Sequence, residues 1–130
     1  MITAGEIFEC AMALIDELDE EGSAYSADTE IYARRAPSMI SSLAEEARRI
    51  AGKRGEYGIL DDLEDIVEDV DDSYAAGILP YGLAAALLHD ENPASAGFLQ
   101  TRYEEMRDWY ANHAPAAEEQ IEDIYGVYDW

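Results

Sequence analysis

Apolar residues recur at helical spacing at the start of the chain. Thr3 and Glu6 have the spacing of a capping box, in which each side chain binds a backbone N–H of the other residue. An apolar stripe on one helix face follows: Ile7, Phe8, Ala11, Leu14, Ile15 and Leu18. The sequence therefore predicts a first helix that begins after Thr3. Gly22 and its polar neighbours end the pattern, and we expect a loop over residues 19–25.

A second apolar stripe predicts a long helix in the next part of the chain. Ser26 is its predicted N-cap, and the helix extends to about Ala51, with Gly52 at the C′ position. Pro37 interrupts this stripe, and a proline in a helix interior costs about 3 kcal/mol. We therefore expect a break near Arg35, which places Pro37 in the first turn of the longer piece.

An acidic stretch separates this helix from the second half of the chain. Eight of the twelve residues 61–72 are acidic and none is basic. Like charges three and four residues apart oppose a helix. The sequence therefore predicts an acidic loop near residues 56–72.

The longest run without a charged residue extends from Ser73 to Leu88, sixteen residues. A helix needs about 20 apolar residues to span a bilayer, so the run is interpreted as a buried core helix. Asp71 or Asp72 is its predicted N-cap, and Pro80 kinks it.

Asn92 and Pro93 then predict the start of another helix, which extends to about His113 and has Leu99, Tyr103, Met106 and Tyr110 on its packing face. The connection to the preceding core helix is short, so the two helices should form an antiparallel hairpin.

Together these elements predict an all-α fold, a small bundle of four to five helices with kinks at Pro37 and Pro80. Residues 1–114 form the predicted helical domain, and residues 115–130 form a C-terminal tail that is extended or a short helix. Apolar residues gather in this tail: Ile121, Ile124, Tyr125, Val127, Tyr128 and Trp130. Such an end either folds back onto the domain or binds a partner.

The formal net charge of −22 is extreme for 130 residues. Such a surface repels phosphates, which argues against general binding to nucleic acids or to anionic membranes. Six of the eight basic residues lie between positions 34 and 54. They either balance local acids or meet the acidic face of a neighbouring copy. The predicted interface residues are Arg34, Arg35, Arg48, Arg49, Arg54, Tyr125, Tyr128 and Trp130.

No residue pattern points to catalysis. Cys10 lies on or beside the first apolar stripe and is interpreted as inert packing. His89 and His113 lack a glutamate three residues earlier, so the pattern of a di-iron bundle is absent. The acidic run does not have the ligand spacing of an EF-hand, and no glycine-rich phosphate loop occurs. We therefore expect a protein that is not an enzyme and that has no metal site and no cofactor.

The N-terminus MITAGEIFEC has neither the basic flank nor the continuous apolar core of a signal peptide. The residues therefore predict a soluble, cytoplasmic protein that does not bind a membrane.

One segment resembles a known family. LPYGLAAALL at residues 79–88 and DENPASAGFLQTRYEEM at residues 90–106 look like a segment of the small head–tail connector or adaptor proteins of tailed phages and prophages. The opening TAGEIFECAMALIDEL and the closing IEDIYGVY are similar to the ends of the same group. The positions that the resemblance carries over are structural: Leu79, Pro80, Tyr81, Gly82 and Tyr103. The family has no catalytic residues to transfer.

The resemblance implies a helical structural protein that forms a ring beneath the portal and extends the DNA channel. Its expected partners are further copies of the chain, the portal and the tail-completion proteins. DNA passes through the ring without specific binding, because an acidic wall repels the phosphate backbone. The expected location is the host cytoplasm during assembly and then the neck of the virion.

Two other functions compete with this one. An acidic module could mimic DNA and occupy a nucleic-acid-binding partner, which requires carboxylates spaced like phosphates on one face. A metal-dependent helical-bundle enzyme would need inward carboxylates together with histidine, and the sequence disfavours it.

Overall fold

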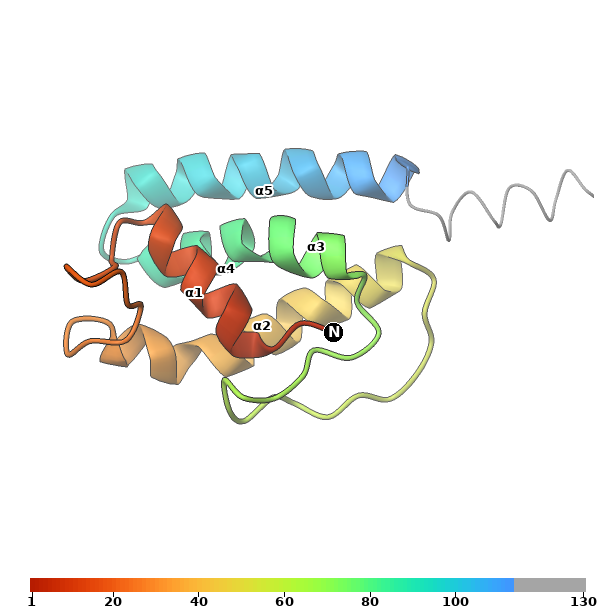
Figure 1. Ribbon diagram of the computed structural model, residues 1–130. Helices are drawn as coiled ribbons and strands as arrows, with labels where there is room; N and C mark the ends of the chain where they lie inside the picture. Colours follow the sequence, from red (N-terminus) through yellow and green to blue (C-terminus); the bar gives the residue numbers. More distant parts are fainter. Residues whose placement is uncertain (114–130) are drawn as a thin grey trace, which may run out of the picture.

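Five α-helices make up the part of the chain that the computed structural model describes, residues 1–113. They are α1 (Ala4–Leu14), α2 (Glu30–Ile50), α3 (Asp72–Gly77), α4 (Leu79–Leu88) and α5 (Pro93–His113). Figure 1 shows α5 lying antiparallel to α4 along one side of the bundle, with α1 and α2 on its other sides. Within the described residues no β-strand forms, and the all-α prediction is confirmed. The predicted tail lies outside these residues.

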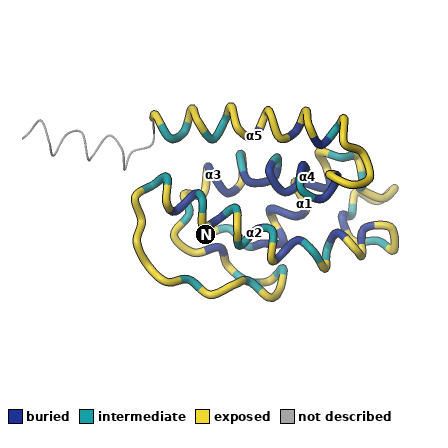
Figure 2. The backbone as a smooth tube through the Cα atoms, turned by 180° about the vertical axis from the view of Figure 1, so that it is seen from behind, coloured by how far each residue is buried: buried dark blue, intermediate teal, exposed yellow. Residues whose placement is uncertain are grey.

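Helix α4 lies at the centre of the bundle. Its sequence LPYGLAAALL has no charged residue, and eight of its ten residues are buried. All four other helices pack against it, and Figure 2 shows it as one of the most continuously buried segments. The prediction that the uncharged run is a buried core element is confirmed.

The interruption predicted at Pro80 is present and takes the form of a helix break. Helix α3 ends at Gly77, and Ile78 separates it from α4. Pro80 then lies in the first turn of α4, where a missing N–H costs no helical hydrogen bond. Asp71 is the N-cap of α3, because its carboxylate accepts a hydrogen bond from the backbone N–H of Ser73 at 3.0 Å.

The break predicted near Arg35 is wrong. Helix α2 is continuous from Glu30 to Ile50, with Pro37 in its interior. Pro37 is buried, and its neighbours Ala36 and Ile40 are fully buried in the core, so packing offsets the lost hydrogen bond.

The start of α2 also differs from the predicted N-cap at Ser26. The helix begins after Thr29, whose hydroxyl group donates a hydrogen bond to the Ala24 carbonyl at 2.7 Å and accepts one from the Ser26 N–H at 3.0 Å. The end of α2 is as predicted, with Gly52 at positive φ (74°) in the C′ position.

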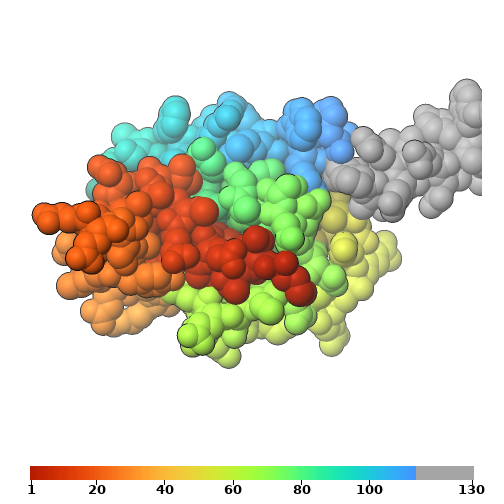
Figure 3. Space-filling model, in the orientation of Figure 1, coloured from red at the N-terminus to blue at the C-terminus, as the bar shows by residue number. Residues whose placement is uncertain are grey.

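The acidic loop closes the N-terminal end of α1. Thr3 Oγ1 accepts a hydrogen bond from the N–H of Glu6 at 3.2 Å, as predicted. The N–H groups of Ala4 and Gly5 donate to the Asp65 and Leu63 carbonyls of the loop, at 2.9 and 2.6 Å. The first-turn donors of α1 therefore have partners. In the space-filling view of Figure 3, α1 crosses this face between α5 and the loop.

Three helices meet at Gly82 of α4. A Cβ atom built there would lie 3.0 Å from Leu43 of α2 and 3.0 Å from the ring of Tyr103 of α5. Both contacts are closer than ordinary van der Waals contact, so the absent side chain lets α4 approach its neighbours.

We expect Gly82→Ala to destabilise the protein. Overpacking a core costs about 1–3 kcal/mol, and the better helix propensity of alanine returns at most about 1 kcal/mol. Gly97→Ala in α5 is the matched control, because a Cβ there meets no atom within 4 Å. This control should gain about 0.5–1 kcal/mol. Thermal unfolding followed by circular dichroism should therefore shift in opposite directions, and a gain for both variants would contradict the close approach.

Candidate functional site

The structure separates the predicted interface arginines into two groups. Arg34 and Arg35 lie near the N-terminal end of α2, and Arg48 and Arg49 lie in its last turn. At 1.5 Å per residue, Arg34 and Arg49 are separated by about 22 Å along the helix. Arg34 forms an ion pair with Glu30 at 2.9 Å. The arginines therefore do not make one patch.

Arg48 is used inside the chain. It is only 7% exposed, and its Nε donates a hydrogen bond to the Glu68 carbonyl at 2.8 Å. Its guanidinium carbon lies 3.9 Å from the centre of the Tyr57 ring. Tyr57 in turn donates a hydrogen bond from its hydroxyl group to Asp69. Arg48 is therefore an anchor of the acidic loop and is not available to a partner, contrary to the prediction.

The other predicted interface residues are differently placed. Arg34, Arg49 and Arg54 are exposed and Arg35 is half-buried, and their role in an interface stays a prediction. The aromatic residues predicted with them lie outside the described residues: Tyr125, Tyr128 and Trp130.

The acidic run is exposed, and some of its carboxylates accept hydrogen bonds that stabilise the conformation of the loop. Seven of the eight acids in residues 61–72 are exposed, and Asp65 is half-buried. The Asp65 carboxylate accepts hydrogen bonds from the N–H groups of Asp61 and Asp62, at 3.0 and 3.1 Å. Hydrogen bonds from the backbone and hydroxyl group of Ser73 hold the pKa of Asp71 below its ordinary value.

The nucleophilic and metal-binding side chains do not gather. Cys10 is exposed, so its assignment to core packing is wrong. Partial burial, with Glu9 and Glu6 nearby, raises the pKa of its thiol, which disfavours the reactive thiolate. His113 lies against the Trp109 ring, with centroids 4.3 Å apart. In the described part of the chain, no three of the His, Cys, Asp and Glu side chains are close enough to hold a metal ion.

A polar network that no local sequence pattern predicts joins α5 to α2. Tyr103 donates a hydrogen bond from its hydroxyl group to Glu46, and Arg107 lies 3.4 Å from the other oxygen of the same carboxylate. Burial, reinforced by the Glu46 carboxylate, raises the pKa of Tyr103 well above its ordinary value. The phenol therefore stays protonated, and the network holds the two helices together. Glu46 and Tyr103 are 57 residues apart in sequence, and a local sequence pattern cannot link residues at that separation.

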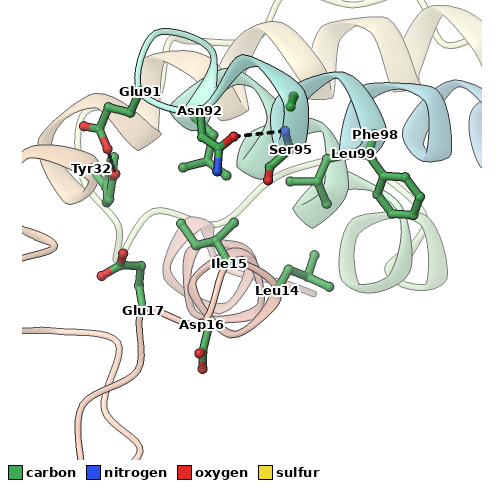
Figure 4. A pocket seen from close by; sticks show the side chains of 12 residues that line it. Leu14, Ile15, Asp16, Glu17, Tyr32, Glu91, Asn92, Ser95, Phe98 and Leu99 are labelled. Atoms are coloured by element: carbon green, nitrogen blue, oxygen red, sulfur yellow. Dashed lines mark hydrogen bonds between the residues drawn. The ribbon is translucent and has the colours of Figure 1, made fainter.

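A groove of about 690 Å³ lies between the end of α1 and the start of α5 (Figure 4). Its apolar part includes Leu14, which is 39% exposed, and Phe98, which is 74% exposed. Three carboxylates and no basic side chain line it: Asp16, Glu17 and Glu91.

The carboxylate of Glu91 in this groove accepts a hydrogen bond from the hydroxyl group of Tyr32. This contact, more than burial, raises the pKa of Tyr32 to about 12. The residues of the groove come from distant parts of the chain, so no local sequence pattern predicts it.

Comparison with known proteins identifies no relative of this chain. Neither protein-family models, nor curated protein sequences, nor solved structures match this chain. Among the described helices, none is long and apolar enough to cross a membrane.

We expect Arg48→Ala to destabilise the fold by about 2–3 kcal/mol, because it removes a buried charged hydrogen bond and the contact with the ring of Tyr57. The neighbouring exposed Arg49 provides the control, and Arg49→Ala should change stability by less than about 0.5 kcal/mol. Urea unfolding of both variants measures this difference. Equal stability of the two variants would contradict the anchoring role of Arg48.

Proposed function

We propose that this chain is a structural subunit of a tailed phage or prophage particle, which forms part of a ring between portal and tail and lines the passage for DNA. The proposal starts from the resemblance of residues 79–106 to the head–tail connector proteins. One observation carries it: this segment is a single packing unit, the hairpin of α4 and α5.

The positions that the resemblance singles out lie in this unit. Leu79 and Pro80 are buried at the start of α4. Gly82 and Tyr103 face one another, with the ring 3.0 Å from a Cβ built on the glycine. Residues 79–106, which resemble the connector proteins, thus include much of the packed core of this domain. This supports the proposal that the chain has the fold and the structural role of those proteins.

The charge of the chain supports a wall around DNA. The net charge is −22, and most carboxylates of the acidic loop are exposed. Such a surface repels the phosphate backbone, so packaged DNA moves past it without binding. An enzyme acting on DNA or a DNA-binding protein would instead need a basic surface.

The outer face of α5 supports contact with other proteins. Only three of its 21 residues are buried, Ala96, Leu99 and Tyr103. Phe98 and Trp109 are 74% and 63% exposed on this helix. Exposed aromatic side chains are typical anchors of protein interfaces.

We expect the purified chain to form ring-shaped particles with a central hole when it is mixed with the portal protein encoded in the same genome. Negative-stain electron microscopy and light scattering measure this. The free portal, imaged alone, is the control for added mass. A chain that stays monomeric and never binds that portal would contradict the connector role.

The exposed acidic loop favours a second candidate, an acidic module that mimics DNA. This candidate requires a nucleic-acid-binding partner from which DNA displaces the chain. We expect no such competition: binding of the chain to portal should be unchanged by added duplex DNA. Displacement by DNA at low salt would favour the mimic over the connector.

A further inference from the structure

We infer that copies of this chain associate head to tail, with the basic end of α2 from one copy in the acidic groove of the next. The basic end is defined by Arg49 and Arg54, and the acidic groove by Leu14, Glu17, Glu91 and Phe98. The inference deepens the proposed ring and rests on that function for its biological role. The contact itself is argued from the two surfaces.

The acidic groove combines an apolar surface with negative charge. Phe98 is 74% exposed, although it is a large aromatic side chain, and Leu14 beside it is 39% exposed. Figure 4 shows Glu17 and Glu91 on one side of these apolar residues. The groove therefore suits a ligand with an apolar stem and a cationic head, and an arginine side chain has this form.

The basic end carries such side chains. Residues 47–55 contain four basic residues and no acidic one. Arg48 is buried under the loop, and Lys53 lies 3.9 Å from Asp69. Arg49 and Arg54 are exposed, and neither forms an ion pair with any residue in the range 1–113. Within residues 1–113, Arg49 and Arg54 are therefore two exposed cations that have no carboxylate within ion-pair distance.

The two surfaces lie at opposite ends of one molecule. Tyr32 lines the groove and Arg49 lies on the same helix, about 26 Å further along at 1.5 Å per residue. Figure 1 shows the turn between α4 and α5 at one end of the bundle and the last turn of α2 at the other. A chain therefore cannot fill its own groove with its own basic end.

A second copy satisfies both surfaces at once. Its arginine stems cover Phe98 and Leu14, the guanidinium groups lie against the aromatic face, and the carboxylates accept their hydrogen bonds. Because the two patches differ, the contact is heterologous, and repetition of it yields a ring where the rotation closes. The contact pairs opposite charges locally, but the net charge of −22 makes whole copies repel each other, so association is expected where salt screens this overall repulsion.

Exchange of charge between the two surfaces tests this contact. The first variant is Arg49→Glu with Arg54→Glu, and the second is Glu17→Lys with Phe98→Lys. Each variant alone should self-associate at least about tenfold more weakly than the wild type, because like charges then meet. An equimolar mixture should associate again, because each variant supplies the surface that complements the other. Sedimentation velocity at about 0.15 M salt, where the Debye length is about 8 Å, measures all three samples.

The control is Arg34→Glu, compared with Arg49→Glu alone, which changes the net charge by the same amount; Arg34 is exposed, pairs with Glu30 and does not line the groove. Self-association of the Arg34→Glu variant should remain that of the wild type. A wild type that is monomeric at millimolar concentration and about 0.15 M salt overturns the inference. A mixture of folded variants that stays monomeric, or a first variant that associates as the wild type does, also overturns it.

Failure of the head-to-tail contact and failure of the connector role give different experimental results. If rings form on the portal and Arg49→Glu with Arg54→Glu leaves them intact, the head-to-tail contact is wrong and the connector role stands. If charge-dependent association is found but the chain never binds the portal, the contact stands and the connector role fails.

Discussion

The burial of α4 is the constraint on which the rest of the structure depends. A helix that is apolar on every side must be covered on every side, and α1, α2, α3 and α5 all pack against it. The cover is close where α2 and α5 reach Gly82 through Leu43 and Tyr103. Because α1 and α2 pack inward on α4, most of their charged residues lie on their outer faces, whereas eight of the acids lie together in residues 61–72.

The acidic loop is held against this core by the buried side chain of Val67 and by polar contacts with α1 and α2. Its carbonyl groups accept hydrogen bonds from the first turn of α1, and Arg48 holds its far side through Glu68 and Tyr57. The loop thus keeps a dense set of carboxylates on the surface without an equal number of cations.

Local signals in the sequence predicted the helices well, because caps and stripes act within a few residues. Thr3, Gly52, Asp71 and Asn92 all mark helix ends as expected. Pro37 misled the prediction, because tertiary packing holds α2 together through it. The burial of Arg48 and the bond between Glu46 and Tyr103 depend on residues distant in sequence, which no local pattern connects. For the same reason the acidic groove became visible only in the folded chain, while the exposed arginines at 49 and 54 were already apparent as a basic cluster.

A cryo-electron microscopy reconstruction of the full chain assembled on the portal of the same genome tests the connector role and its geometry most directly. We expect a ring of copies in which Arg49 and Arg54 of each copy lie in the groove beside Phe98 of the next, with a DNA-sized channel at the centre. A portal that never acquires the chain would contradict the role. A ring in which copies meet through other surfaces would contradict the head-to-tail contact.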